Sequence, residues 1–444
     1  MLEQHGIDYI LLEAYPTIAP QAGASIGLAP NGLRILDQLG CYERVRDMAG
    51  NYYKTLDMRD LEGRLLFSNR GPGFAERFEH IVMPGKRVVQ VEMSDEGPAL
   101  IHTQDGSVYD GDIVVGADGV HSATRAEMWR LAAQLRPGTF PADEESRLKA
   151  EAKCIFGISK IPADFPSTTQ LLVSSKGLSH MAIPGPGDRL YWFMFVSMAT
   201  TPSRDIPRWS KQDEEELAEQ HFKDKITDKV TFGDIYNNRR ATALVPLEEH
   251  VFTRWHFKRI ITIGDSAHKV GHLRAICQNL SQVAYTVLSQ VHPLTALGGN
   301  GAMESAALLC NALARRLKQN SGVLSDADIE EAFLEVQVRQ LRRAQDIVKE
   351  GKRTQRWVNQ LYPLSGLVMR YLLPLAWENL FIGGDLKVSL EGPRIEKLVI
   401  PERPHTIPFR DEMPEPAPRA TWTVWSAGIL VLGVVGYYMA QSMG

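Results

Sequence analysis

Cysteine is scarce in this sequence, and the few cysteines form no framework. There are four, and no two are spaced as a C-x-x-C pair or grouped with histidines as in a zinc site: Cys41, Cys154, Cys277 and Cys310. This argues against a disulfide-stapled or zinc-finger class of protein and fits a reducing compartment. We therefore interpret all four as small buried hydrophobic side chains and predict no metal site.

The chain also lacks an excess of charge of one sign. It has 49 Lys and Arg against 53 Asp and Glu, a formal net charge of −4. Nucleic-acid binding requires a basic surface, so we expect no nucleic-acid partner. The first residues, Met1 to Gly6, hold neither a basic nor an apolar stretch, which argues against a secretory signal. No internal repeat is visible, and the 44% hydrophobic content is ordinary for a globular protein.

Long hydrophobic runs are absent except at the C-terminal end. Residues 422–439 contain no charged side chain over about 18 residues, which is near the lower limit for crossing a bilayer. Aromatic side chains of the kind found at membrane interfaces flank the run: Trp422, Trp425, Tyr437 and Tyr438. A buried amphipathic helix is the alternative, but it would need a polar face. We expect a transmembrane helix over 421–440, anchoring a cytosolic domain to the endoplasmic reticulum membrane.

Hydrophobic periodicity predicts an α/β domain that is interrupted by a β-rich one. The run Ile7–Glu13 is typical of a buried parallel strand, and 30–39 of a helix. The first part of the α/β domain is predicted over 1–150, with a short β excursion at 53–91, and the β-rich domain over 151–254. The α/β domain is expected to return over 255–352, with an insertion at 270–290. A helical region over 353–400 and a Pro-rich linker over 401–420 follow.

Three sites along the chain have residues suited to binding a nucleotide cofactor. Glu13 ends a predicted strand, where a carboxylate is well placed to accept hydrogen bonds from ribose hydroxyls. Asp265, in Gly264-Asp-Ser-Ala-His268, follows the predicted strand at 260–263 in the same way. Gly298 and Gly299 precede a predicted helix, and they remove side chains where a flat ligand must approach its N-terminus. Each string alone is also compatible with a simple turn.

Four motifs together resemble those of the hydroxybenzoate-hydroxylase-like FAD-dependent monooxygenases, and most of all the fungal branch that acts on indole-diterpene and meroterpenoid intermediates. They are Glu13, Ala19–Gly27 with Pro30-Asn-Gly32, Gly116-Ala-Asp-Gly119-Val-His-Ser122 with Arg125, and the Gly264–His268 string. The resemblance implies an FAD-binding Rossmann-like domain interrupted by a substrate domain. It also implies a set of FAD-binding residues: Glu13, Gly23, Gly27, Arg77, Asp265, Gly298 and Gly299. Asp118-Gly119 matches a motif that handles both FAD and NAD(P)H.

By this resemblance the protein is expected to use NAD(P)H and O2 to epoxidise or hydroxylate a lipophilic, prenylated intermediate of secondary metabolism. The oxygen chemistry belongs to the cofactor, so no catalytic side chain is named. His268 is interpreted as structural. Relatives often have a Tyr where this chain has Ser174, which leaves the substrate contacts open.

The sequence departs from the family in three places. The first strand and the G-x-G-x-x-G phosphate loop of a dinucleotide fold are missing before Ile7. A helix that normally follows Arg77 is absent. Residues 270–290 intervene before the glycines, and we interpret them as a retained intron, with a genuine inserted loop as the alternative. These departures keep two other hypotheses open: a non-catalytic or mis-spliced remnant that binds no FAD, and a flavoprotein with another chemistry such as dehydrogenation.

Overall fold

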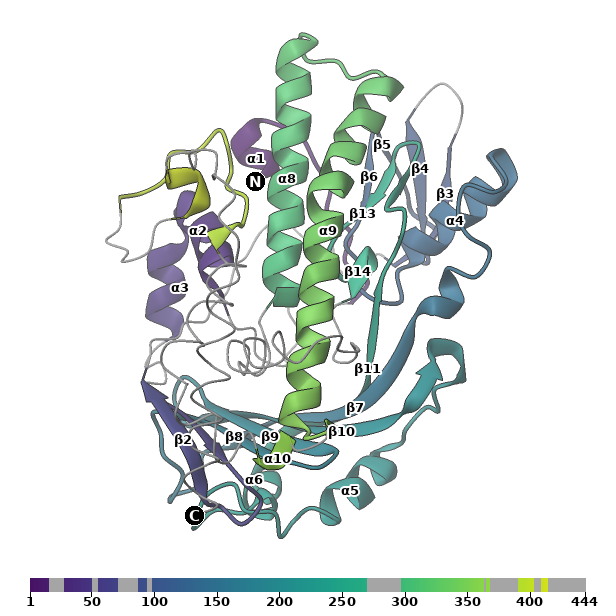
Figure 1. The fold of residues 1–444 in the computed structure, drawn as a ribbon. Helices are drawn as coiled ribbons and strands as arrows, with labels where there is room; N and C mark the ends of the chain where they lie inside the picture. The colour runs from purple at the N-terminus through teal and green to yellow at the C-terminus, as the bar shows by residue number, and fades with distance from the viewer. Residues whose placement is uncertain are drawn as a thin grey trace, which may run out of the picture.

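The computed structural model describes residues 1–15, 28–49, 55–70, 87–93, 98–269, 297–362, 365–367, 390–402 and 409–413. The helices in these ranges are α1 (Leu2–His5), α2 (Pro30–Gln38), α3 (Tyr42–Ala49), α4 (Ala123–Leu135), α5 (Lys211–Glu219), α6 (Phe232–Asn237), α8 (Leu297–Gln319), α9 (Asp326–Val358) and α10 (Ser365–Leu367). The long helices α8 and α9 run side by side through the middle of the molecule (Figure 1).

The largest sheet lies below these helices and has the strand order β14-β11-β7-β10-β9-β8-β1-β2 (Figure 1). Its strands are β1 (Thr55–Arg59), β2 (Leu65–Arg70), β7 (Lys149–Lys160), β8 (Thr169–Ser175), β9 (Leu178–Pro184), β10 (Arg189–Pro202), β11 (Arg239–Val251) and β14 (His268–Lys269). Neighbouring strands are antiparallel, except that β1 runs parallel to β8.

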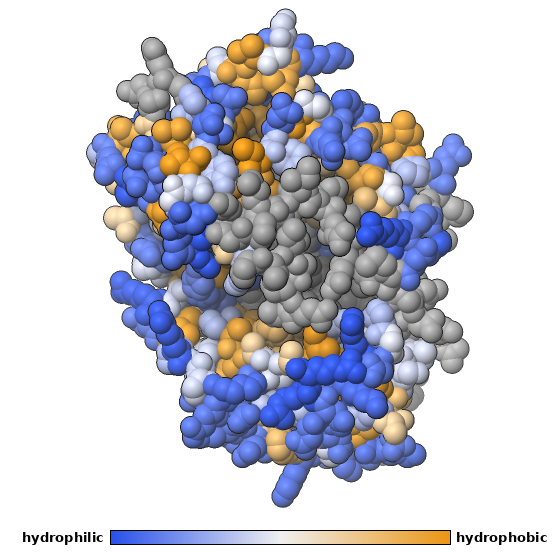
Figure 2. Space-filling view, turned by 180° about the vertical axis from the view of Figure 1, so that it is seen from behind, coloured by the Kyte–Doolittle hydropathy of each residue, from blue (hydrophilic) through white to orange (hydrophobic). Residues whose placement is uncertain are grey.

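The two faces of this sheet are both apolar because side chains alternate along each strand. On β10, Trp192 and Met194 point to the face covered by α6, where they join a core with Phe232. The next residue, Phe195, points to the opposite face and packs with Val358 at the end of α9. Helices α5 and α6 therefore close the lower face, and hydrophilic side chains dominate the outer surface of this part of the molecule (Figure 2).

Two small sheets form the upper part. One has the order β12-β13-β6, from β12 (His256–Phe257), β13 (Ile260–Thr262) and β6 (Val114–Gly116), with β13 and β6 parallel. The other is the antiparallel meander of β3 (Val88–Glu92), β4 (Ala99–Thr103) and β5 (Val108–Gly111). Strand β13 is fully buried because Ile261 packs against α8 and α9, whereas Ile260 packs with Met128 of α4 on the other side. Such two-sided burial is typical of a parallel α/β sheet.

Most predicted elements are present close to their expected bounds. The predicted helix at 30–39 is α2, and the predicted helices near Asn300 and at 327–352 are α8 and α9. The predicted strands at 99–103, 154–158 and 190–196 fall within β4, β7 and β10. Strands β1 and β2, which lie in the expected β excursion at 53–91, join the largest sheet, whereas β3 joins the meander. The domain boundaries proposed from the sequence stay a prediction.

The expected buried strand at Ile7–Glu13 is wrong. This segment has a single bridge residue, Leu12, and exposes Tyr9, Ile10 and Leu11 by 39%, 57% and 45%. Only its ends pack, Ile7 beside the α8 core and Leu12 beside the β4–β6 core. A central strand of a parallel sheet needs a hydrogen-bonded neighbour on each side, and the described residues place no ladder against this segment.

We also correct the expectation of a C-terminal transmembrane helix and of a single-pass location in the endoplasmic reticulum membrane. In the described ranges, no helix combines the length and the apolar character needed to cross a bilayer. The charge-free run at 421–440 itself lies outside the described residues. The expectation had rested on composition alone, which does not separate a membrane span from other apolar segments of this length.

Candidate functional site

The carboxyl ends of β6 and β13 meet the beginning of α8. The short helical turn Gly264–Ser266 follows β13, and Ser266 donates a hydrogen bond from its hydroxyl to the carbonyl of Gly116 at the end of β6. Gly264 has a φ of +60°, and a Cβ there would lie 3.0 Å from the Cβ of Ala302 in α8. Only glycine suits this position, because the backbone is left-handed and the helix lies against it. A crevice at the strand ends that faces a helix N-terminus is where α/β folds bind nucleotides.

Asp265 lies in this turn with its side chain about one third exposed, and it pairs with Lys269. Its carboxylate is thus held by one ion pair and remains accessible from solvent. Glu13, the other acid expected at the cofactor, is half-buried and accepts a hydrogen bond from the backbone amide of Tyr15, 2.9 Å away. Both carboxylates keep acceptor capacity for hydroxyl groups of a ligand.

Helix α2 is packed directly onto the first turn of α8. A Cβ on Gly32 would lie 1.9 Å from Oδ1 of Asn300 and 2.6 Å from the methyl carbon of Met303. The same Oδ1 of Asn300 accepts a hydrogen bond from the amide of Ala29, 3.1 Å away, just before α2 begins. The pair Gly32 and Asn300 therefore sets how closely the two helices approach each other.

A buried polar network fixes the same helices to α9. Glu304 of α8 is fully buried, and both of its carboxylate oxygens lie 2.6 Å from guanidinium nitrogens of Arg343. Asn31 of α2 and Gln340 of α9 donate further hydrogen bonds to it, at 2.6 Å and 3.1 Å. The charge of Glu304 is thus compensated in place, as a buried carboxylate requires.

A second network joins the turns that follow β6 and β13. Asp118 accepts hydrogen bonds from the hydroxyl of Ser122 at 2.5 Å and from the amide of Thr124 at 2.9 Å. Arg125 donates to the carbonyls of Ser266 and Val120, at 2.9 Å and 2.6 Å. Burial lowers the pKa of Arg125 to about 10, against the opposing effect of Asp118, so its guanidinium stays protonated at neutral pH. It serves as a fixed cation that ties the two turns together.

His268 has no geometry for proton transfer in this arrangement. Its ring is 2% exposed, lies 5.1 Å from the ring of Trp255, and places Nε2 3.4 Å from the hydroxyl of Ser305. Burial lowers its pKa to about 4, so the ring is neutral near pH 7. This supports the interpretation of His268 as a structural residue.

The residues expected at the cofactor are only partly covered by the structure. Glu13, Asp265, Gly298 and Gly299 are described, and the last two lie in the first turn of α8. Gly23, Gly27 and Arg77 lie outside the described residues, as does the insertion at 270–290. The described part fits a flavin dinucleotide, because two accessible carboxylates and a glycine-opened helix N-terminus accompany a parallel strand pair. The individual binding roles stay predictions.

Sequence reasoning missed the network of Glu304, Arg343 and Asn31. The only signal was a pair of charges on two different helices, 39 residues apart in the chain. The structure also explains Ser174, which stands where relatives often have Tyr. Its side chain is buried and donates a hydrogen bond to the carbonyl of Val358, so it anchors the end of α9 on the sheet.

The face of the largest sheet toward α9 is rich in aromatic and aliphatic side chains. The rings of Phe193 and Phe195 stack with their centroids 5.8 Å apart. Residues on this face that are only partly buried are Leu66, Phe156, Ile183, Phe193, Val245 and Leu247. We call this set the apolar sheet face.

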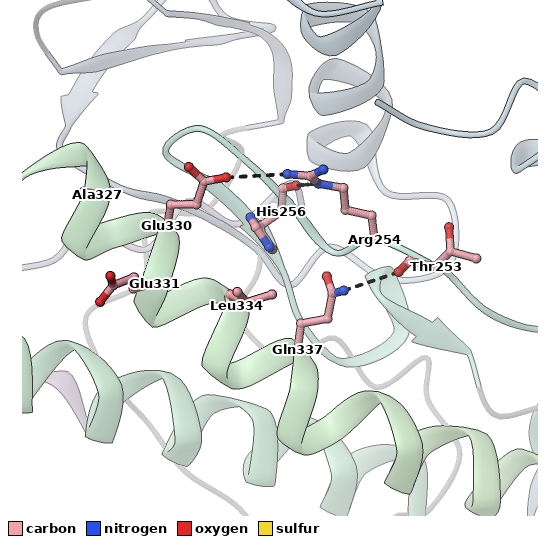
Figure 3. A pocket seen from close by; sticks show the side chains of 8 residues that line it. All are labelled: Thr253, Arg254, His256, Ala327, Glu330, Glu331, Leu334 and Gln337. Carbon is pink, nitrogen blue, oxygen red and sulfur yellow. Dashed lines mark hydrogen bonds and ion pairs between the residues drawn. The ribbon is translucent and has the colours of Figure 1, made fainter. Parts of the chain in front are cut away.

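A cleft of about 540 Å³ lies elsewhere, between α9 and the segment before β12 (Figure 3). Its polar side chains are engaged with one another: Arg254 pairs with Glu330 at 3.6 Å, and Gln337 donates to the carbonyl of Thr253 at 3.4 Å. None of the residues that line it belongs to the predicted cofactor set. This cleft is separate from the site at the strand ends.

Comparison with known proteins identifies related FAD-dependent monooxygenases. The FAD-dependent monooxygenase spyC of Aspergillus fumigatus is 35% identical over 401 residues, which span 85% of this chain and 80% of that protein. The FAD-dependent monooxygenase atmM of Aspergillus flavus is 32% identical, over 98% of this chain and 90% of that protein. A scan of protein-family models finds no match.

Solved structures show the same fold at lower identity. Klebsiella pneumoniae HpxO, in complex with FAD and uric acid, matches with a TM-score of 0.65 and 19% identity, over 88% of this chain and 93% of that one. The 2,6-dihydroxypyridine-3-hydroxylase from Arthrobacter nicotinovorans matches with a TM-score of 0.59 and 15% identity, over 91% of this chain and 94% of that one. The sequence similarity, together with the fold, shows that the chain belongs to the hydroxybenzoate-hydroxylase-like FAD-dependent monooxygenases, in their fungal secondary-metabolism branch.

Proposed function

We propose that this FAD-dependent monooxygenase uses NAD(P)H and O2 to epoxidise or hydroxylate a lipophilic, prenylated intermediate of the meroterpenoid or indole-diterpene kind. The observation that carries the substrate class is the apolar sheet face, where partly buried Phe156, Phe193 and Ile183 lie on the side of the sheet toward α9. Apolar side chains that retain some exposure favour a ligand with a large hydrocarbon surface.

In this proposal Glu13 and Asp265 accept hydrogen bonds from the hydroxyl groups of FAD, while Gly298 and Gly299 let it approach the first turn of α8. Gly23, Gly27 and Arg77 complete the set by resemblance. Bound FAD supplies the oxygen-activating chemistry once NAD(P)H has reduced it. The N-terminus of α8, held by Glu304 and Asn300, provides amide dipoles that favour negative charge near it.

The apolar sheet face contributes in two ways. It binds the hydrocarbon part of the substrate, and it keeps water away from the place where oxygen is transferred. No protein side chain needs to act as a nucleophile. Specificity for a prenylated substrate then follows from hydrophobic contact area more than from individual hydrogen bonds.

The test begins with the visible absorption spectrum of the purified chain, after incubation with FAD and desalting. Retained flavin that bleaches with NADPH or NADH supports the proposal and identifies the reductant. Incubation with prenylated lipophilic compounds under ¹⁸O2 should then yield one labelled oxygen atom in the product. A product without the label would indicate dehydrogenation instead, and a colourless protein would mean that this chain does not bind FAD.

A further inference from the structure

A cluster of two histidines and one aspartate lies far from the strand-end site, on the lower face of the largest sheet. Nε2 of His180 and Nδ1 of His221 lie 2.8 Å and 2.9 Å from the same carboxylate oxygen of Asp224. Each side chain offers one donor atom, and the three donor atoms lie within 4.8 Å of one another. This is the only such group of three among the residues that the structure describes.

The cluster connects a strand of the largest sheet with the segment that covers one face of this sheet. His180 lies in the middle of β9, on the face that packs against the core of Trp192 and Phe232. His221 and Asp224 belong to the connection that leads from α5 to α6, which covers this face (Figure 1). A ligand held by all three would therefore fasten the covering segment to a central strand of the sheet.

The cluster is largely shielded from solvent, with side-chain exposures of 2% for His180, 17% for Asp224 and 23% for His221. Burial would raise the pKa of Asp224, but the hydrogen bonds from His180 and His221 outweigh it and hold the pKa at about 2. Burial lowers the pKa of His180 below its ordinary value, although Asp224 opposes this. The Asp224 carboxylate supplies a negative charge to the cluster, and the neighbouring Lys223 and Lys225 are exposed.

We propose that His180, His221 and Asp224 form a binding site for a divalent transition metal, with Zn²⁺ as the preferred ion. Two imidazole nitrogens and one carboxylate oxygen are ligands typical of Zn²⁺, whose bonds to them are about 2.0–2.2 Å long. Ligand atoms around such an ion lie about 3.3 Å apart, so the two hydrogen bonds must open by about 0.5 Å. The Asp224 side chain, which is 17% exposed, has to move back to open these two contacts. The ring nitrogens of His180 and His221, now within 4.8 Å of each other, have to take up the same spacing, and water completes the coordination on the exposed side.

A metal bound at Nε2 of His180 and Nδ1 of His221 takes the place of the ring protons on these nitrogens. In the metal-free state both rings donate N–H groups to Asp224, and in the bound state each ring carries its proton on the other nitrogen. Nδ1 of His180 is buried and has no hydrogen-bond partner among the described residues. Zinc-binding histidines normally have such a partner, and its loss weakens binding by about 10–100-fold. The site is thus expected to be of moderate affinity and to serve stability, with no part in oxygen transfer.

The full chain, freed of metal with EDTA and exchanged into chelator-free buffer, should be titrated with Zn²⁺ by calorimetry. His221→Gln and Asp224→Asn alter the half-buried members of the cluster, and His102→Gln is the matched control. His102 is a partly exposed histidine beside Glu92, 3.3 Å away, on a different sheet. Circular dichroism without metal should show the same fold for all four proteins.

The proposal predicts that the wild type and His102→Gln each bind one equivalent of Zn²⁺ with similar affinity. His221→Gln and Asp224→Asn should bind Zn²⁺ at least about tenfold more weakly than the wild type. Zinc should likewise raise the melting temperature of the first two proteins more than that of the other two. Equal affinity and equal thermal shift in all four proteins would overturn it. If one cluster variant unfolds, the other decides the outcome by the same two measurements.

Discussion

Glu304 and Arg343 form a buried, bidentate ion pair that joins α8 to α9, with both nitrogen–oxygen distances at 2.6 Å. Because Glu304 has no solvent exposure, its charge depends entirely on Arg343 and on the amides of Asn31 and Gln340. This pair fixes the position of the N-terminal turn of α8 relative to α2 and α9. It therefore supports the proposed flavin site without contacting the cofactor.

Removing Arg343 should therefore be costly. We expect Arg343→Ala to lower the free energy of unfolding by about 3–5 kcal/mol, because it leaves the Glu304 carboxylate buried without its cation. Urea denaturation followed by circular dichroism measures this. Arg339→Ala is the control, since Arg339 is half-exposed and pairs with Glu335 at 3.2 Å, and it should cost less than about 1 kcal/mol. A similar loss in both variants would contradict the assignment.

Gly32→Ala should loosen the contact between α2 and α8. The added methyl group would overlap Oδ1 of Asn300 and the end of Met303, so one of them must move. We expect a loss of about 1–3 kcal/mol in stability and weaker FAD binding, measured by urea denaturation and flavin fluorescence. Gly111→Ala is the control, because the nearest atom to its Cβ is 3.6 Å away. If Gly32→Ala binds FAD as tightly as the wild type, the contact has no role in the cofactor site.

Asp265→Asn tests the proposed acceptor at the flavin. The substitution keeps the size of the side chain but removes its charge, and a hydrogen bond to a charged group contributes about 1.5–3 kcal/mol. We expect the Kd for FAD to rise about tenfold or more while the fold is retained. Lys269→Met is the control, because it removes the ion pair but keeps the Asp265 carboxylate. Any change in the Kd of Lys269→Met measures the effect of losing the ion pair alone. An unchanged Kd in Asp265→Asn would show that the charge of Asp265 does not contribute to FAD binding.

Phe193→Ala tests the apolar sheet face as the substrate surface. Loss of the ring should raise KM for a lipophilic substrate about tenfold, since burying an aromatic side chain contributes about 1.5–3 kcal/mol. The rate of flavin reduction by NAD(P)H without substrate should change much less. Leu334→Ala, at an exposed position of α9, is the control for a general effect of truncation. Equal KM values for the two variants would place the substrate elsewhere.

The stability of the protein should depend on pH through His268. Its pKa is lowered to about 4 by burial, so the unfolded chain binds this proton more readily than the fold does. Stability should therefore decrease as pH falls from about 6.5 to about 4, by up to about 1.4 kcal/mol per pH unit from this group. His268→Gln should flatten the curve in that range, whereas His121→Gln, at a mostly exposed position, should not. Parallel curves for all three proteins would refute this origin.

Local pattern was enough to predict many of the elements. Helices α2, α8 and α9 follow from apolar residues at helical spacing, and β4, β7 and β10 from short runs of β-branched and aromatic side chains. Four motifs were sufficient to indicate the family: Glu13, Ala19–Gly27 with Pro30-Asn-Gly32, the Gly116–Ser122 string with Arg125, and the Gly264–His268 string. Gly264 shows a local reason for such a motif, since its φ of +60° and its closeness to Ala302 require glycine.

The remaining features depend on contacts between residues far apart in the chain. The same apolar pattern that marks β13 also marks Ile7–Glu13, yet of these two segments only β13 forms a ladder within the described part of the chain, with β6. Likewise Glu304 meets Arg343 across 39 residues, and His180 meets Asp224 across 44. Most of the elements and the family could thus be predicted from local residue patterns, because helix and strand periodicity and glycine-dependent turns are local properties. Which strands pair and which charges meet depends on how the elements pack in three dimensions, so only the folded structure shows it.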